Sequence, residues 1–135
     1  MLTSYRTLMA ALAFTVLPAN VYADLDAAET AVLAWLESVD SGEFEKAWDE
    51  ASPLLQRPLS PQMLARTIAL ARKDVGPLES RRRVRVVSDT SMPGAPQGDY
   101  KIFTFQTNFA NRHLTETVTP HFEDGAWRVS GYYVQ

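Results

Sequence analysis

The chain has 135 residues, no cysteine and a formal net charge of −3. The absence of cysteine excludes disulfides, thiol catalysis and thiolate metal sites. The mildly acidic composition lacks the basic excess of nucleic-acid-binding proteins, so we expect no nucleic-acid partner.

The first 23 residues have the pattern of a cleavable signal peptide. Arg6 precedes the apolar run Leu8–Leu17, and Val21-Tyr22-Ala23 offers small residues at the expected cleavage point. The run is about half as long as the roughly 20 apolar residues of a membrane-spanning helix. We therefore expect a signal peptide over residues 1–23 and one mature domain over residues 24–135. The mature protein should be periplasmic or secreted, without stable membrane insertion.

Helical periodicity dominates the first half of the mature domain, with apolar residues at spacings of three and four. Serine before proline is a helix start signal, and glycine before proline is a stop signal. Arg66, Arg72 and Lys73 are expected to face water. Three helices are predicted: about Leu25 to Asp40, capped by Asp24 or Asp26; Glu43 to Ala51, closed by Pro53; and Ser60-Pro61 to Gly76-Pro77.

The second half changes to the alternating pattern of β-strands. Met92–Gly98 is a loop by its proline and glycine content, and Asp124-Gly125 is a strong hairpin signal. Helices followed by strands predict an α+β fold, with three N-terminal helices packed on a curved four-stranded antiparallel sheet. The predicted strands are Glu79 to Ser88, Tyr100 to Ala110, Leu114 to Phe122 and Ala126 to Val134.

The register of the two later hairpins predicts which face is buried. A tight turn around Asn111-Arg112 sets Phe109 opposite Leu114, and the Asp124-Gly125 turn sets Glu116 opposite Tyr133. The shared apolar face then comprises Phe103, Phe105, Phe109, Leu114, Val118, Phe122, Trp127 and Val129.

Thr107, Glu116 and Tyr133 interrupt this apolar face and are the candidate ligand-binding residues. Burial raises the pKa of a carboxyl group that has no partner, and such groups mark functional sites. Alternatively, Glu116 is structural, touches water and bonds Tyr133 or a nearby arginine.

A basic run lies on the first predicted strand. Strict alternation places Arg81, Arg83 and Arg85 on one face, where they could bind an anionic surface or an acidic partner protein. We favour the other interpretation, a solvated strand whose charges prevent edge-to-edge aggregation. His113 and His121 are not arranged with carboxylates as a metal site, and no cofactor motif is present, so neither a metal nor a cofactor is expected.

Two segments of the second half, Pro93 to Asn111 and Glu116 to Tyr133, resemble the DUF4019 family of small exported bacterial proteins of uncharacterised function. Asp40-Ser41-Gly42, Phe44 and Trp48 fit the same resemblance, which covers nearly the whole mature domain. The resemblance implies a fold of the cystatin-like or NTF2-like group and supplies no catalytic residues.

Two classes of function follow from these patterns. The leading hypothesis is a non-catalytic cell-envelope domain that binds a small apolar ligand or a protein partner. The alternative is a proton-transfer enzyme, with Glu116 as a base of raised pKa and Tyr133 as a donor in an apolar pocket. The sequence leaves the ligand, the partner and the oligomeric state open.

Overall fold

The computed structural model describes residues 19–135, so most of the expected signal peptide lies outside the described residues. The helices are α1 (Ala19–Asp40), α2 (Phe44–Asp49), α3 (Pro53–Gln56) and α4 (Pro61–Ala71). The strands are β1 (Leu78–Asp89), β2 (Asp99–Phe109), β3 (His113–Glu123) and β4 (Ala126–Val134). The predicted α+β class is confirmed.

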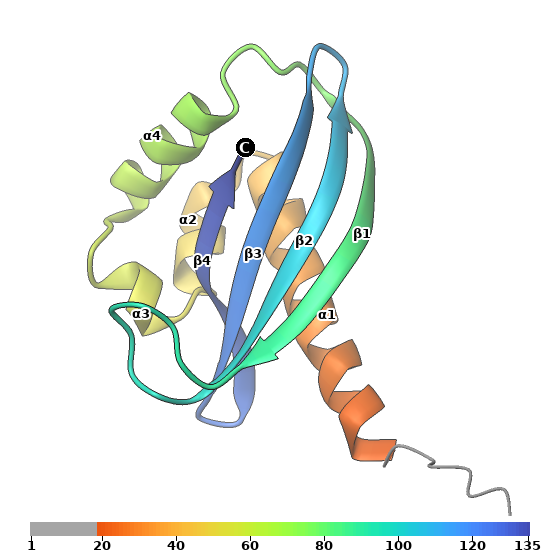
Figure 1. Ribbon diagram of the computed structural model, residues 1–135. Helices are drawn as coiled ribbons and strands as arrows, with labels where there is room; N and C mark the ends of the chain where they lie inside the picture. The colour runs from red at the N-terminus through yellow and green to blue at the C-terminus, as the bar shows by residue number, and fades with distance from the viewer. Residues whose placement is uncertain (1–18) are drawn as a thin grey trace, which may run out of the picture.

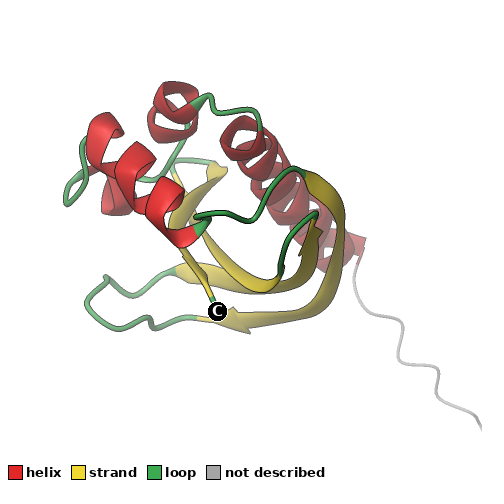
Figure 2. Cartoon of the chain, turned by 90° about the horizontal axis from the view of Figure 1, so that it is seen from above, coloured by secondary structure: helices red, strands yellow, loops and turns green. Residues whose placement is uncertain are grey.

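The four strands form one antiparallel sheet in the order β1-β2-β3-β4. The sheet curves around the helices, which all lie on its concave side (Figures 1 and 2). We call this covered side the inner face and the opposite side the outer face. No helix within residues 19–135 is long and apolar enough to cross a bilayer.

The helices follow the predicted periodicity, with two differences at their ends. α1 starts at Ala19 rather than near Leu25, so Asp24 lies inside the helix and its carboxylate accepts a bond from Trp127 Nε1 at 3.2 Å. Pro53 does not only end a helix. It begins the short helix α3, which Ser52 caps. Ser60 caps α4 as predicted, accepting a bond from the Met63 amide at 3.1 Å.

The pairing of β2 with β3 is shifted by two residues from the predicted register. Thr107, not Phe109, lies opposite Leu114. The connecting residues are bonded elsewhere: the amides of Ala110 and Asn111 donate to the carbonyls of Pro77 and Val75, just before β1. A shift of two residues preserves the faces, and Phe109 and Leu114 are both buried.

The hairpin between β3 and β4 starts in the predicted register and then slips by one residue. Glu123 faces Ala126 and Phe122 faces Trp127, but a bulge at Ser130 places Glu116 opposite Val134. Tyr132 therefore turns to the inner face. The prediction that Tyr133 lies there is wrong, because its position falls on the outer face and it is 55% exposed.

A second bulge changes the direction of the basic strand. Arg81 and Arg83 pair with Thr107 and Phe105 on the inner face, but the register shifts at Val84. Arg85 consequently pairs with Thr104 and lies on the outer face. The prediction that all three arginines share a face is wrong at Arg85, because the inserted residue inverts the alternation.

The core lies between the helices and the inner face. Its α1 residues recur at the predicted spacings of three and four, and the predicted apolar face of the sheet is buried except for Phe122, which is 38% exposed. The α1 residues of the core are Ala28, Val32, Trp35, Leu36 and Val39.

Candidate functional site

Glu116 is completely buried on the inner face of β3. Its Oε1 accepts bonds from Thr107 Oγ1 at 2.5 Å and from Arg81 Nε at 2.8 Å. Its Oε2 accepts bonds from Arg72 Nη2 at 2.8 Å and from the Tyr132 hydroxyl. Four donors therefore replace the water that the carboxylate loses on folding.

Asp40, at the end of α1, accepts hydrogen bonds from the same two arginines. Its Oδ1 accepts from Arg72 Nη1 at 2.8 Å and from Arg81 Nη2 at 3.0 Å, and its Oδ2 accepts from Arg81 Nη1 at 2.7 Å. Arg72 Nε also donates to the Tyr132 hydroxyl at 3.0 Å. We call this set the Glu116 cluster; it comprises Asp40, Arg72, Arg81, Thr107, Glu116 and Tyr132.

The Glu116 cluster joins elements that are far apart in the sequence. Asp40 comes from α1, Arg72 from the residue that follows α4, and Arg81 from β1. Two carboxylates face two guanidinium groups, so the formal charges balance. Because each pair is nearly removed from water, the cluster holds the helical layer against the sheet through charge-assisted bonds.

The charged forms of the two carboxylates and the two arginines are favoured in the cluster, whereas Tyr132 is kept neutral. Burial alone would raise the pKa of Glu116, but the charge of Arg81 and the bonds from Thr107 and Tyr132 outweigh it and lower that pKa. The pKa of Asp40 is lowered in the same way, mainly by Arg81 and then by Arg72 against the effect of burial. Burial and the charge of Glu116 raise the pKa of Tyr132.

These directions contradict the chemistry expected of a general base. Glu116 was predicted to have a raised pKa, but its pKa is lowered and every oxygen already accepts two bonds. A carboxylate in this state has neither the basicity nor a free lone pair directed at a substrate. The arrangement is that of a structural ion-pair network.

The predicted site residues separate into two groups. Thr107 and Glu116 do meet, and Arg81 joins them instead of lying on a solvated strand. Arg83 forms an exposed ion pair with Glu29 at 2.6 Å, and Arg85 lies apart on the outer face.

Three members of the cluster were missed in the sequence: Asp40, Arg72 and Tyr132. Arg72 was expected to face water, but its side chain is 10% exposed. The signal available was Glu116 itself, since a carboxylate on an apolar face requires cationic partners. Sequence alone did not show which arginines supply them, because the bulges and the end of α4 decide their directions.

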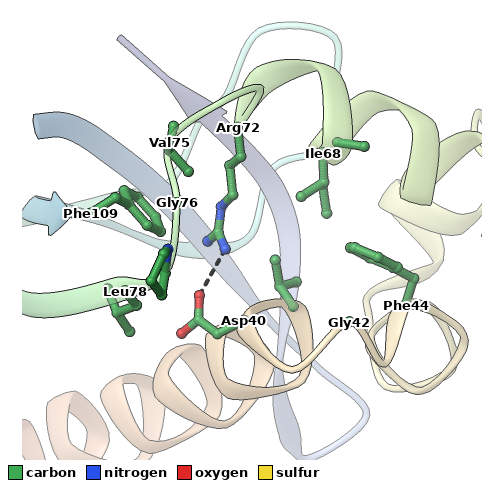
Figure 3. A pocket seen from close by; sticks show the side chains of 12 residues that line it. Asp40, Gly42, Phe44, Ile68, Arg72, Val75, Gly76, Leu78 and Phe109 are labelled. Carbon is green, nitrogen blue, oxygen red and sulfur yellow. Dashed lines mark hydrogen bonds and ion pairs between the residues drawn. The ribbon is translucent and has the colours of Figure 1, made fainter. Parts of the chain in front are cut away.

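A hollow of about 270 Å³ lies beside the cluster, between the ends of α1 and α4 and the start of β1. We call it the helix-end pocket (Figure 3). Its walls are mainly apolar, and Arg72 reaches across it toward Asp40. Glu116 does not line this pocket but accepts a bond from Arg72, which does. The apolar wall residues are Val39, Phe44, Ile68, Val75, Leu78 and Phe109.

The two histidines lie apart on the outer face. His113 contacts Asn108, and His121 stacks on Tyr100 with ring centroids 4.4 Å apart. His121 Nδ1 is 3.1 Å from Glu123 Oε2, although the geometry is not that of a hydrogen bond. Among residues 19–135 no three histidine or carboxylate side chains gather as a metal site would require.

The fold and the Glu116 cluster define a small α+β domain with a buried ion-pair core. A family model described as "Protein of unknown function (DUF4019)" matches residues 31–132, and the chain belongs to that family. No curated protein and no solved structure matches the chain. The cystatin-like or NTF2-like description therefore has no support from a solved structure.

Proposed function

We propose that this protein is an exported, non-catalytic domain that binds a small, mainly apolar ligand in the helix-end pocket. The observation that carries the proposal is the combination of mainly apolar walls with one preorganised ion pair, Arg72 and Asp40. Ligand sites commonly have this composition, and a volume of about 270 Å³ is near the lower end of their range.

The bonds of Arg72 indicate what the ligand carries. A guanidinium group has five N–H donors. Arg72 uses Nε for Tyr132, one Nη1 proton for Asp40 and one Nη2 proton for Glu116. Two N–H groups are left, so the ligand should combine an apolar body with a hydrogen-bond acceptor such as a carbonyl or a hydroxyl. Asp40 balances the charge of the guanidinium group at this wall, so a neutral acceptor fits better than an acid.

The pocket can be tested with small probes and one blocking variant. Cyclohexanone, with toluene as the analogue without an acceptor, would be titrated into the ¹⁵N-labelled domain while amide shifts are recorded. Ala69 is exposed and lines the pocket, so Ala69→Trp should fill the mouth and abolish the shifts near Phe44 and Phe109. Leu70→Trp is the matched control, because Leu70 is 75% exposed and lies outside the lining.

Cyclohexanone should bind more tightly than toluene and should bind the control variant unchanged. Absence of binding, or equal binding to Ala69→Trp, would contradict the pocket. Export has a separate test: N-terminal sequencing of protein recovered from the periplasm or the medium should begin at Asp24. Retention of an uncleaved chain in the cytoplasm would contradict export.

A further inference from the structure

The outer face of β1 carries two arginines, Arg82 and Arg85, that have no ion-pair partner among the described residues. Arg81 and Arg83, on the inner face, both form ion pairs. Arg82 and Arg85 form neither an ion pair nor a side-chain hydrogen bond with any residue in the range 19–135, and both are exposed. The inner-face arginines of β1 are therefore ion-paired, whereas the guanidinium groups of its outer-face arginines are not paired with any described side chain.

The bulge at Val84 brings the two unpaired arginines to the same side. Arg82 pairs with Gln106 and Arg85 pairs with Thr104. Gln106 and Thr104 are alternate residues of β2, so they share the outer face and so do their partners on β1. Without the bulge, Arg85 would lie on the inner face with Arg83. Bulges often redirect a side chain at functional sites.

A hollow of about 670 Å³ is lined by Arg82, and Arg85 lies outside its lining on the same face of the sheet. We call it the outer hollow. Its lining is almost entirely polar and includes no carboxylate, although the whole chain is acidic. Val84 is its one aliphatic lining residue. The polar residues that line it include Ser80, Arg82, Gln106, Asn108 and His113.

We propose that a phosphate group binds at the outer hollow, where Arg82 belongs to the lining and Arg85 reaches the phosphate from the same face of β1. Guanidinium groups bind phosphate oxygens through paired, charge-assisted hydrogen bonds, and a phosphate monoester presents three acceptor oxygens. The Ser80 hydroxyl and the ring of His113 lie on the same hollow as further polar groups. The phosphate belongs either to a soluble phosphorylated compound or to a lipid headgroup.

An acidic peptide fits this surface less well than a phosphate. A peptide strand would add along the backbone edge of β1, and the bulge interrupts the regular spacing of that edge between Arg83 and Arg85. The hollow instead lies over the side chains of β1, β2 and β3. The site is separate from the helix-end pocket, so either proposal can fail without the other.

Inorganic phosphate would be titrated into the ¹⁵N-labelled protein, with sodium chloride holding the ionic strength constant. The shifts should map to β1 and β2 around Arg82 and Arg85. Arg82→Gln and Arg85→Gln should each weaken binding by about tenfold or more, the loss expected for one charge-assisted bond. Arg66→Gln, an exposed arginine on α4, is the control and should bind within about twofold of the original protein.

The thermal midpoints of both variants should match the original, because neither arginine bonds another described side chain. Cosedimentation with phosphatidylglycerol vesicles, with phosphatidylcholine vesicles as the control, distinguishes the two sources of the phosphate. Vesicle binding that depends on Arg82 indicates a lipid headgroup. Binding of inorganic phosphate without binding of vesicles indicates a soluble ligand. Phosphate shifts that map elsewhere, equal weakening by Arg66→Gln, or binding of polyglutamate without binding of phosphate would overturn the proposal.

Discussion

Glu116 carries its charge inside the hydrophobic layer because hydrogen-bond donors surround it on every side. The carboxylate would be costly there without partners, since an isolated buried charge is strongly unfavourable. Its four donors come from three different strands and from the end of α4. The same donors explain why its pKa is lowered by its surroundings although the side chain is fully buried.

Substitutions at Tyr132 and Tyr133 test which of these two neighbouring side chains belongs to the Glu116 cluster. Tyr132→Phe removes the hydroxyl that donates to Glu116 and accepts from Arg72, so the free energy of unfolding should fall by about 2 kcal/mol. Tyr133→Phe should change it by less than about 0.5 kcal/mol, because that side chain is mainly exposed. Urea unfolding of both variants measures the difference. Equal losses would contradict the observed bulge.

The lowered carboxyl pKa values predict an acid-sensitive fold. The stabilisation from Asp40 and Glu116 should be fully present above their unfolded pKa values of about 4 to 4.5 and be lost as the pH falls through the lower folded values. The urea concentration at the midpoint of unfolding should therefore decrease when the pH is lowered below about 4.5. In Glu116→Gln this drop should be smaller, because one of the two groups no longer titrates. Parallel curves for the two proteins would contradict the lowered pKa of Glu116.

At the level of elements, the sequence predicted most of the fold because the periodicities are strong. Apolar spacing located α1 and α4, and the Asp124-Gly125 turn set the first pairs of the last hairpin. The bulges at Val84 and Ser130 were not predicted, because one inserted residue leaves no compositional signal but inverts every later side chain. Those two bulges account for the errors at Arg85 and Tyr133.

The turn from α4 to β1 requires glycine for two separate reasons. Gly76 has φ of +76°, and an added Cβ would lie 2.9 Å from Asn111 Nδ2 and 3.1 Å from the Ala110 Cβ. Gly42 has φ of +75° but nothing within 4 Å of that position. Gly42→Ala should cost about 1 kcal/mol of unfolding free energy from backbone strain alone. Gly76→Ala should cost at least about 1 kcal/mol more from crowding.

Thermal and urea unfolding of the two alanine variants would be compared side by side. The difference between them measures the contact between this turn and the β2–β3 connection, because the backbone strain is nearly equal. If both variants lose the same stability, the contact at Gly76 does not constrain the turn, and the shifted register of the β2–β3 hairpin needs another cause.

At the scale of the whole molecule, the groups that hold the fold lie next to groups that are free to bind. The Glu116 cluster joins α1, the end of α4 and all four strands of the sheet, and both of its carboxylates are bonded to its two arginines. The helix-end pocket and the outer hollow lie on either side of the sheet and contain groups with donors to spare. Sequence patterns located Glu116 and Thr107, but the pocket beside them arises from contacts between helix ends and β1, which no local pattern records.

The most direct test of the structural role of the cluster is the unfolding free energy of the protein beside that of its Glu116→Gln variant. A structural cluster predicts a loss of about 3 kcal/mol, because two buried guanidinium groups then share one carboxylate. An unchanged or increased stability would mean that Glu116 is kept there for another purpose, and would contradict the structural role on which the account depends.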